Sequence, residues 1–183
     1  MNPSDTPIET VIDLYLSACD ELFSTYSLTK RLKRADSDRG KRRGSSYVSV
    51  LGATSETIRF SSTVSIDAGL LKTLHPAPGG KVSQRDLEDW CRELNNQLVG
   101  RVKNKLLRYG CEVSAGLPVL ITGNDIDTLG TPGQDLRRYY FATEHGRLAL
   151  TLAMVPAPDF ELKEVAASPD GEVVRLEGVH DLF

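Results

Sequence analysis

The chain has 183 residues, 40% of them hydrophobic and 26% charged, and a formal net charge of −3. This length and balance are typical of one globular domain with a sizeable core. The apolar runs of the sequence are far shorter than the roughly 20 residues that cross a bilayer, which excludes a transmembrane helix.

The first predicted element is an amphipathic helix that begins after Thr6. Thr6 can cap this helix, Pro7 occupies its first position, and Glu9 completes a capping box. Apolar residues then recur at three- and four-residue spacing, which is typical of a helix packed on a core. These residues are Ile8, Val11, Ile12, Tyr15, Cys19, Leu22, Phe23 and Tyr26.

The next segment, from about Ser27 to Ser46, is polar and basic. Residues 30–43 contain eight of the 22 basic residues, which leaves 14 basic against 23 acidic residues in the rest of the chain. Such a run raises the alternative of a nucleic-acid or anionic-membrane patch. Because no aromatic residues are interleaved and the remainder is acidic, we expect an exposed loop, with no membrane partner and no nucleic-acid partner.

The middle of the chain predicts two strands and a short helix. Residues 47–51 form the first strand, and residues 57–66 form the second, in which apolar and polar side chains alternate. A short helix capped by Asp67 follows and ends before Pro76, where a turn-rich connector begins.

A long helix is predicted from about Ser83 to Gly110. Asp86 stands at the capping-box position, and Gly110 is a helix-ending glycine. About 26 residues at 1.5 Å each give a helix of about 39 Å. A tight hairpin at His145 and Gly146 joins the last two of the strands that follow. Those strands cover residues 112–115, 118–122, 137–144 and 147–155.

Long helices and mostly hairpin-joined strands imply an α+β fold, with an antiparallel sheet and long helices packed on one face. We expect this domain to cover residues 1–160. Residues 161–183 then form a C-terminal extension, with a small hairpin around Pro169-Asp170-Gly171.

The three cysteines, Cys19, Cys91 and Cys111, lie far apart in apolar patterns typical of buried thiols, and no CxxC pair occurs. We therefore expect neither a disulfide framework nor a zinc site. The first five residues lack the basic start and apolar stretch of a secretory signal. Both observations favour a reducing compartment, and we expect a cytoplasmic protein.

The long helix has two faces of different character. At about 100° per residue, its apolar side chains fall in one stripe that we expect to be buried. These residues are Leu87, Trp90, Cys91, Leu94, Leu98, Val102 and Tyr109. Asn95 belongs to the flank of the helix. The far side carries a second stripe of Asp89, Glu93, Asn96, Gly100 and Lys103.

Gly100 is the unusual residue of this second stripe, because glycine in an exposed helix interior costs roughly 1 kcal/mol relative to alanine. Its missing side chain would let a partner surface lie against the helix backbone. Glu93 and Asn96 point the same way, about 60° apart. From the spacing alone, the second stripe is either a solvated polar face or a surface that presents an acid and a carboxamide to a partner.

The stretch from Asp89 to Lys103, followed by Tyr109-Gly110 and the strand at 117–123, resembles the CheX phosphatases of the CheC/CheX/FliY chemotaxis group. Those proteins carry an acid, then E-x-x-N, a glycine and a lysine on one long helix, and then a strand reading P-[TV]-x-[ILV]-x-G. One E-x-x-N motif is similar to CheX and unlike CheC, and the similar order of elements covers about residues 7–155. The matching residues are Asp89, Glu93, Asn96, Gly100, Lys103, Pro118 and Gly123.

The resemblance implies a CheC/CheX-like fold and hydrolysis of the phosphoaspartate on a CheY-like response-regulator receiver domain. Asn96 would orient the attacking water, and Glu93 would pair with the receiver's lysine. Asp89, Gly100 and Lys103 would contact this partner. No cofactor of the chain's own is implied, since the receiver supplies Mg²⁺, and the family also forms homodimers by joining sheets edge to edge.

Arg92 stands next to the motif, where the family usually has a small residue. It favours an alternative of another class, a non-catalytic CheX-like module that binds a receiver or an effector protein in two-component signalling. Release of phosphate from phosphorylated receivers distinguishes the two hypotheses.

Overall fold

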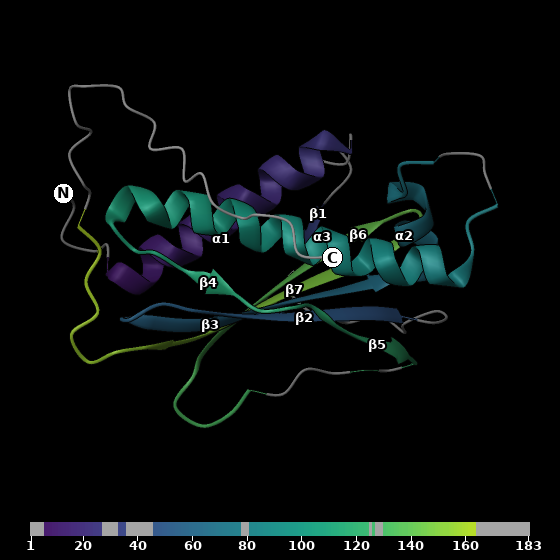
Figure 1. The fold of residues 1–183 in the computed structure, drawn as a ribbon. Coiled ribbons are helices and arrows are strands. Elements are labelled where there is room, and N and C mark those ends of the chain that lie inside the picture. Colours follow the sequence, from purple (N-terminus) through teal and green to yellow (C-terminus); the bar gives the residue numbers. More distant parts are fainter. Residues whose placement is uncertain are drawn as a thin grey trace, which may run out of the picture.

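The structure is a computed structural model, and it describes residues 6–26, 33–35, 46–77, 81–124, 126 and 130–163. Its described strands form one antiparallel sheet of seven strands in the order β1-β6-β7-β3-β2-β4, with β5 also paired to β2 (Figure 1). The strands are β1 (Lys33–Ala35), β2 (Ser46–Thr54), β3 (Ile58–Asp67), β4 (Ser114–Ala115), β5 (Val119–Gly123), β6 (Asp135–Thr143) and β7 (Gly146–Pro156). β4 and β5 pair with opposite ends of β2 along one edge.

The helices lie together on one face of this sheet, as Figure 1 shows. They are α1 (Pro7–Thr25), α2 (Ala68–Leu74) and α3 (Gln84–Leu106), and a 3-10 turn, η1 (Leu107–Tyr109), continues α3. One hydrophobic core fills the space between the helices and the sheet. The predicted α+β class, with long helices on one face of an antiparallel sheet, is confirmed.

Local signals set the bounds of α3. The Ser83 hydroxyl accepts from the Asp86 N–H, and the Asp86 carboxylate accepts from Ser83 in return, so both halves of the capping box form. Hydrogen bonds from the Ser83 side chain and backbone lower the pKa of the Asp86 carboxyl. At the other end, Gly110 adopts φ 67°, a left-handed conformation that suits glycine.

The N-terminus of α1 differs from the sequence prediction in one detail. The Thr6 hydroxyl accepts from the Glu9 N–H at 3.3 Å, as a cap should. The Glu9 carboxylate, however, accepts from Arg137 Nη2 on β6 at 3.0 Å rather than turning back to Thr6. The second half of the predicted capping box is therefore replaced by a contact that ties α1 to the sheet.

The expected loop over the basic run was wrong for three residues. Lys33–Ala35 forms the edge strand β1, which pairs antiparallel with residues 140–142 of β6. A strand of three residues is too short to show alternation in the sequence. The rest of the basic run, and the hairpin expected around Pro169-Asp170-Gly171, lie outside the described residues.

Candidate functional site

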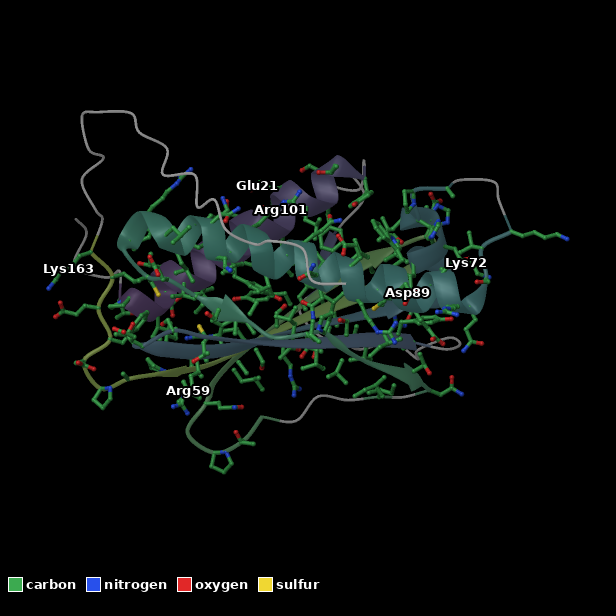
Figure 2. All side chains as sticks on the ribbon, viewed as in Figure 1. Glu21, Arg59, Lys72, Asp89, Arg101 and Lys163 are labelled. Carbon is green, nitrogen blue, oxygen red and sulfur yellow. The ribbon has the colours of Figure 1, made fainter. Side chains whose placement is uncertain are left out.

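The second stripe of α3 faces away from the sheet. Asp89, Glu93 and Asn96 are exposed, and Gly100 and Lys103 are partly buried. Asp89, labelled in Figure 2, marks the end of the stripe that is nearer to α2. One rigid helix thus presents the five predicted site residues in a row.

A buried polar cluster fixes the rotation of α3 on the sheet. Asn95 is 0% exposed, and its Nδ2 donates to the Ser49 carbonyl at 2.9 Å and to the Ser62 carbonyl at 3.1 Å. Its Oδ1 accepts from the Ser62 hydroxyl at 2.8 Å, and that hydroxyl also contacts the Tyr15 hydroxyl at 3.0 Å. Asn95 was expected on the helix flank, but it points into the sheet. Its neighbour Asn96 is therefore turned about 100° away, toward solvent.

Asn96 has no hydrogen-bond or ion-pair partner among the described residues, and its side chain is exposed. A carboxamide offers two N–H donors and an oxygen that accepts two hydrogen bonds. All of this capacity is open to an incoming group. Asn96 can therefore both donate to and accept from a water molecule at a docked surface.

Gly100 lies one turn beyond Asn96. A Cβ added at this position would meet no described residue beyond its own helix backbone within 4 Å, so the packing of the described residues does not require a glycine here. Its backbone conformation is ordinary α-helix, so conformational strain does not require one either. None of the described residues fills the space beside Gly100, and an external surface could occupy it.

Glu93 is held by a neighbour on its own helix. Gln97 Nε2 donates to Glu93 Oε1 at 2.8 Å, and Gln97 Oε1 accepts from the Tyr26 hydroxyl at 3.3 Å. The second carboxylate oxygen of Glu93 has no partner among the described residues, so it can accept from a cationic donor.

Asp89 is paired within the chain. Arg92 Nη1 donates to Asp89 Oδ1 at 2.7 Å, and both side chains are partly exposed. Exposed ion pairs of this kind contribute little to stability. Their effect here is on the surface charge, because Arg92 offsets the negative charge of Asp89 beside Glu93.

A shallow pocket of about 250 Å³ opens between the end of α2 and the first half of α3. Trp90 and His75 line it with their rings edge-to-face and their centroids 5.9 Å apart. The Trp90 ring also meets the Tyr26 ring edge-to-face, with centroids 5.5 Å apart. The lining residues are His75, Asp86, Asp89, Trp90 and Glu93. The stripe therefore has a concave acidic flank beside Glu93.

The thiols do not offer a nucleophile to this surface. Cys19, Cys91 and Cys111 are free and buried, as the sequence predicts. Burial raises the pKa of Cys19 strongly and raises the pKa of Cys91 to about 12, which disfavours the thiolate. In the described part of the chain, no group of three or more His, Cys, Asp or Glu side chains is placed to hold a metal ion.

Sequence reasoning missed two residues of this surface. Gln97 could have been found, because a glutamine four residues after a glutamate on a helix is placed to bond it. Tyr26 gave no local signal, since it lies 71 residues before Gln97 in the chain.

Solved structures with similar folds come from chemotaxis proteins. The chemotaxis protein CheX from Vibrio vulnificus is 16% identical and has a TM-score of 0.66, and the match covers 82% of this chain and 99% of that one. A CheC-like superfamily protein from Shewanella sp. PV-4 is 15% identical, with a TM-score of 0.65 and coverage of 79% and 96%. The CheX chain in a CheX-CheY-BeF3-Mg²⁺ complex from Borrelia burgdorferi is 13% identical, with a TM-score of 0.60 and coverage of 79% and 97%.

These matches show that the chain has a CheX- and CheC-like fold, as the sequence resemblance implied. No family model and no curated relative matches the sequence. Each helix in the described ranges is too short or too polar to span a lipid bilayer.

Proposed function

We propose that this chain is a phosphatase that hydrolyses the phosphoaspartate of a CheY-like receiver domain, with α3 docked over the receiver's phosphorylation site. The main support is the row formed by Glu93, Asn96 and Gly100, in which an exposed carboxamide lies beside a glycine that no contact with the described residues requires. The CheX-like fold supports it, because one of the similar structures is a complex with CheY.

The chemistry is one that positioned polar groups can accelerate. An acyl phosphate is already reactive, so the main task is to hold a water molecule in line with the bond that breaks. The water oxygen attacks phosphorus, and the P–O bond to the receiver's aspartate breaks. The aspartate leaves as a carboxylate with the electron pair, and inorganic phosphate and a proton are released. Mg²⁺ held by the receiver would offset the charge of the phosphoryl oxygens.

Asn96 is the residue that we assign to the water. It extends from a rigid helix, and its donors and acceptor have no partner among the described residues. Its oxygen would accept a hydrogen bond from the water while its N–H groups donate to a phosphoryl oxygen. The chain then needs no nucleophile of its own, which agrees with the buried thiols of Cys19 and Cys91.

Glu93 is the residue that we assign to docking. Its free carboxylate oxygen would accept from the lysine of the receiver's active site, an interaction between full charges. Asp89 and Lys103 lie at the two ends of the row and would contact the rim of the receiver. Because Asp89 is paired with Arg92, it would reach the partner only together with that guanidinium.

Gly100→Ala tests the reason for the glycine. Because the added methyl group meets none of the described side chains within 4 Å, the variant should be more stable by about 0.5–1 kcal/mol in urea denaturation. The same methyl group would separate the docked backbones, so receiver binding measured by calorimetry should weaken about tenfold. A variant that is more stable and binds its receiver as tightly as the wild type would contradict this role.

The alternative is a module that binds a receiver without hydrolysing its phosphate. The Arg92–Asp89 pair is the observation that favours it, since it places a guanidinium on the docking face. Under this alternative the chain binds a phosphorylated receiver but does not shorten the lifetime of the phosphoryl group. Measuring binding and phosphate release on the same receiver decides between the two.

A second copy of the chain is the other partner that we propose. Among the described strands β5 pairs only with β2, and apolar side chains are exposed on β5 and just before it, with Leu117 at 89%, Val119 at 61% and Ile121 at 47% exposure. An open apolar edge strand is a template for pairing with another sheet. Sedimentation equilibrium should therefore give a dimer for the wild type and a monomer for Val119→Lys. A monomeric wild type at micromolar concentration would contradict the pairing.

A further inference from the structure

The Glu93 carboxylate ends a hydrogen-bonded chain that begins on a different helix. Tyr26, the C-cap residue of α1, donates to Gln97, and Gln97 donates to Glu93. We propose that Gln97 and Tyr26 are positioning residues that hold the Glu93 carboxylate ready for the receiver's lysine. This inference rests on the proposed function and adds two residues to it.

Which group donates in each of these hydrogen bonds follows from the chemistry of the side chains. A carboxylate only accepts hydrogen bonds, so the amide nitrogen of Gln97 must face Glu93. The amide oxygen then faces Tyr26, whose hydroxyl can donate to it. Each contact thus pairs a donor with an acceptor, and reversing the amide would set its oxygen against the Glu93 carboxylate.

Packing fixes Tyr26, the first residue of this hydrogen-bonded series. The Tyr26 ring meets the Trp90 ring edge-to-face, with centroids 5.5 Å apart and planes at 84°. Trp90 is buried in the core, three residues before Glu93, and Gln97 lies four residues after it. Tyr26 therefore contacts α3 at Trp90 and at Gln97, about one turn before and one turn after Glu93. The Glu93 carboxylate is thus linked through Gln97 and Tyr26 to the buried Trp90 ring.

The same helix provides a matched control. Gln84 Nε2 donates to Glu88 Oε1 at 2.9 Å, which is another glutamine–glutamate pair four residues apart. Glu88 lies about 140° around the helix from Glu93, outside the row of site residues. If such pairs were only structural, replacing either glutamine would have the same effect on the receiver reaction.

The size of the effect follows from side-chain ordering. A glutamate that is free in solution must lose rotamer freedom when it docks, and this ordering weakens an interaction roughly two- to tenfold. Gln97 and Tyr26 remove part of that penalty in advance. They touch neither the water nor the phosphoryl group, so KM for the receiver should change and kcat should not.

The kinetic test uses a receiver domain phosphorylated with acetyl phosphate. Gln97→Met should raise KM two- to tenfold with kcat unchanged, and Gln84→Met should leave both constants as in the wild type. Tyr26→Phe should raise KM less, and should add nothing in the Gln97→Met background, because Tyr26 acts through Gln97. An unchanged KM in Gln97→Met, or additive effects in the double variant, would overturn the proposal.

A second measurement needs no receiver. In ¹H–¹⁵N NMR spectra of the free protein, the side-chain amide signals of Gln97 should move in Tyr26→Phe and again in Glu93→Gln, while those of Gln84 stay in place. Unmoved Gln97 signals would show that the hydrogen bonds from Tyr26 to Gln97 and from Gln97 to Glu93 do not form. If those signals move as expected but the wild type accelerates no receiver, the hydrogen bonds exist but the proposed function fails, and the positioning role of Gln97 and Tyr26 fails with it.

Discussion

Asn96→Ala should lose the stimulated dephosphorylation of a receiver by at least about 100-fold, because a mispositioned water forfeits most of the advantage of in-line attack. Its free energy of unfolding should stay within about 0.5 kcal/mol of the wild type, since the side chain is exposed and bonds nothing in the described structure. Phosphate release and urea denaturation on the same preparation measure both quantities.

The matched control for this variant is Gln84→Ala. It removes another exposed carboxamide from α3, twelve residues before Asn96. Its turnover should equal that of the wild type, so that a loss in Asn96→Ala cannot come from a general effect on the helix surface. Full turnover in Asn96→Ala would remove the water-orienting role, whatever the binding data show.

Asn95→Ala, in contrast, should lower the stability of the fold. Its four hydrogen-bond contacts join α3 to β2 and β3, and the residue is fully buried. At about 1 kcal/mol for each bond, with losses that overlap, the free energy of unfolding should fall by about 3 kcal/mol. Urea denaturation followed by circular dichroism measures this change. A loss below 0.5 kcal/mol would contradict the anchoring role.

Two adjacent asparagines are therefore expected to separate stability from activity. Asn95 holds the helix in one rotation, and that rotation turns Asn96 outward. Asn95→Asp provides a further comparison. It keeps the shape but replaces the donor toward the Ser49 and Ser62 carbonyls with a buried charge, so it should destabilise the fold at least as much as alanine does.

The row of site residues could be predicted because it depends on local geometry. A helix repeats every 3.6 residues, so the spacing of Glu93, Asn96 and Gly100 was enough to put them on one face. The same geometry placed Asn95 on the flank. Only the positions of Ser49 and Ser62 on the sheet show that this flank is buried, and those residues are distant in the sequence.

The features that sequence reasoning missed depend on contacts between distant segments. Tyr26 reaches Gln97 because α1 packs against α3, and no spacing in the sequence predicts that pair. The strand at Lys33–Ala35 exists because β6 offers an edge to pair with, since its own three residues carry no strand pattern. Helix bounds were predicted more closely because caps such as Ser83 and Gly110 are local.

The proposed activity of this chain is the catalysed loss of phosphate from a receiver. The direct measurement is the lifetime of the phosphoryl group on a panel of receivers phosphorylated with acetyl phosphate, with the chain present at a small fraction of the receiver concentration. We expect at least one receiver to lose its phosphate with many turnovers per chain, and Asn96→Ala to abolish this acceleration. Unchanged or longer lifetimes across the panel, with receivers bound, would contradict catalysis and leave the binding module.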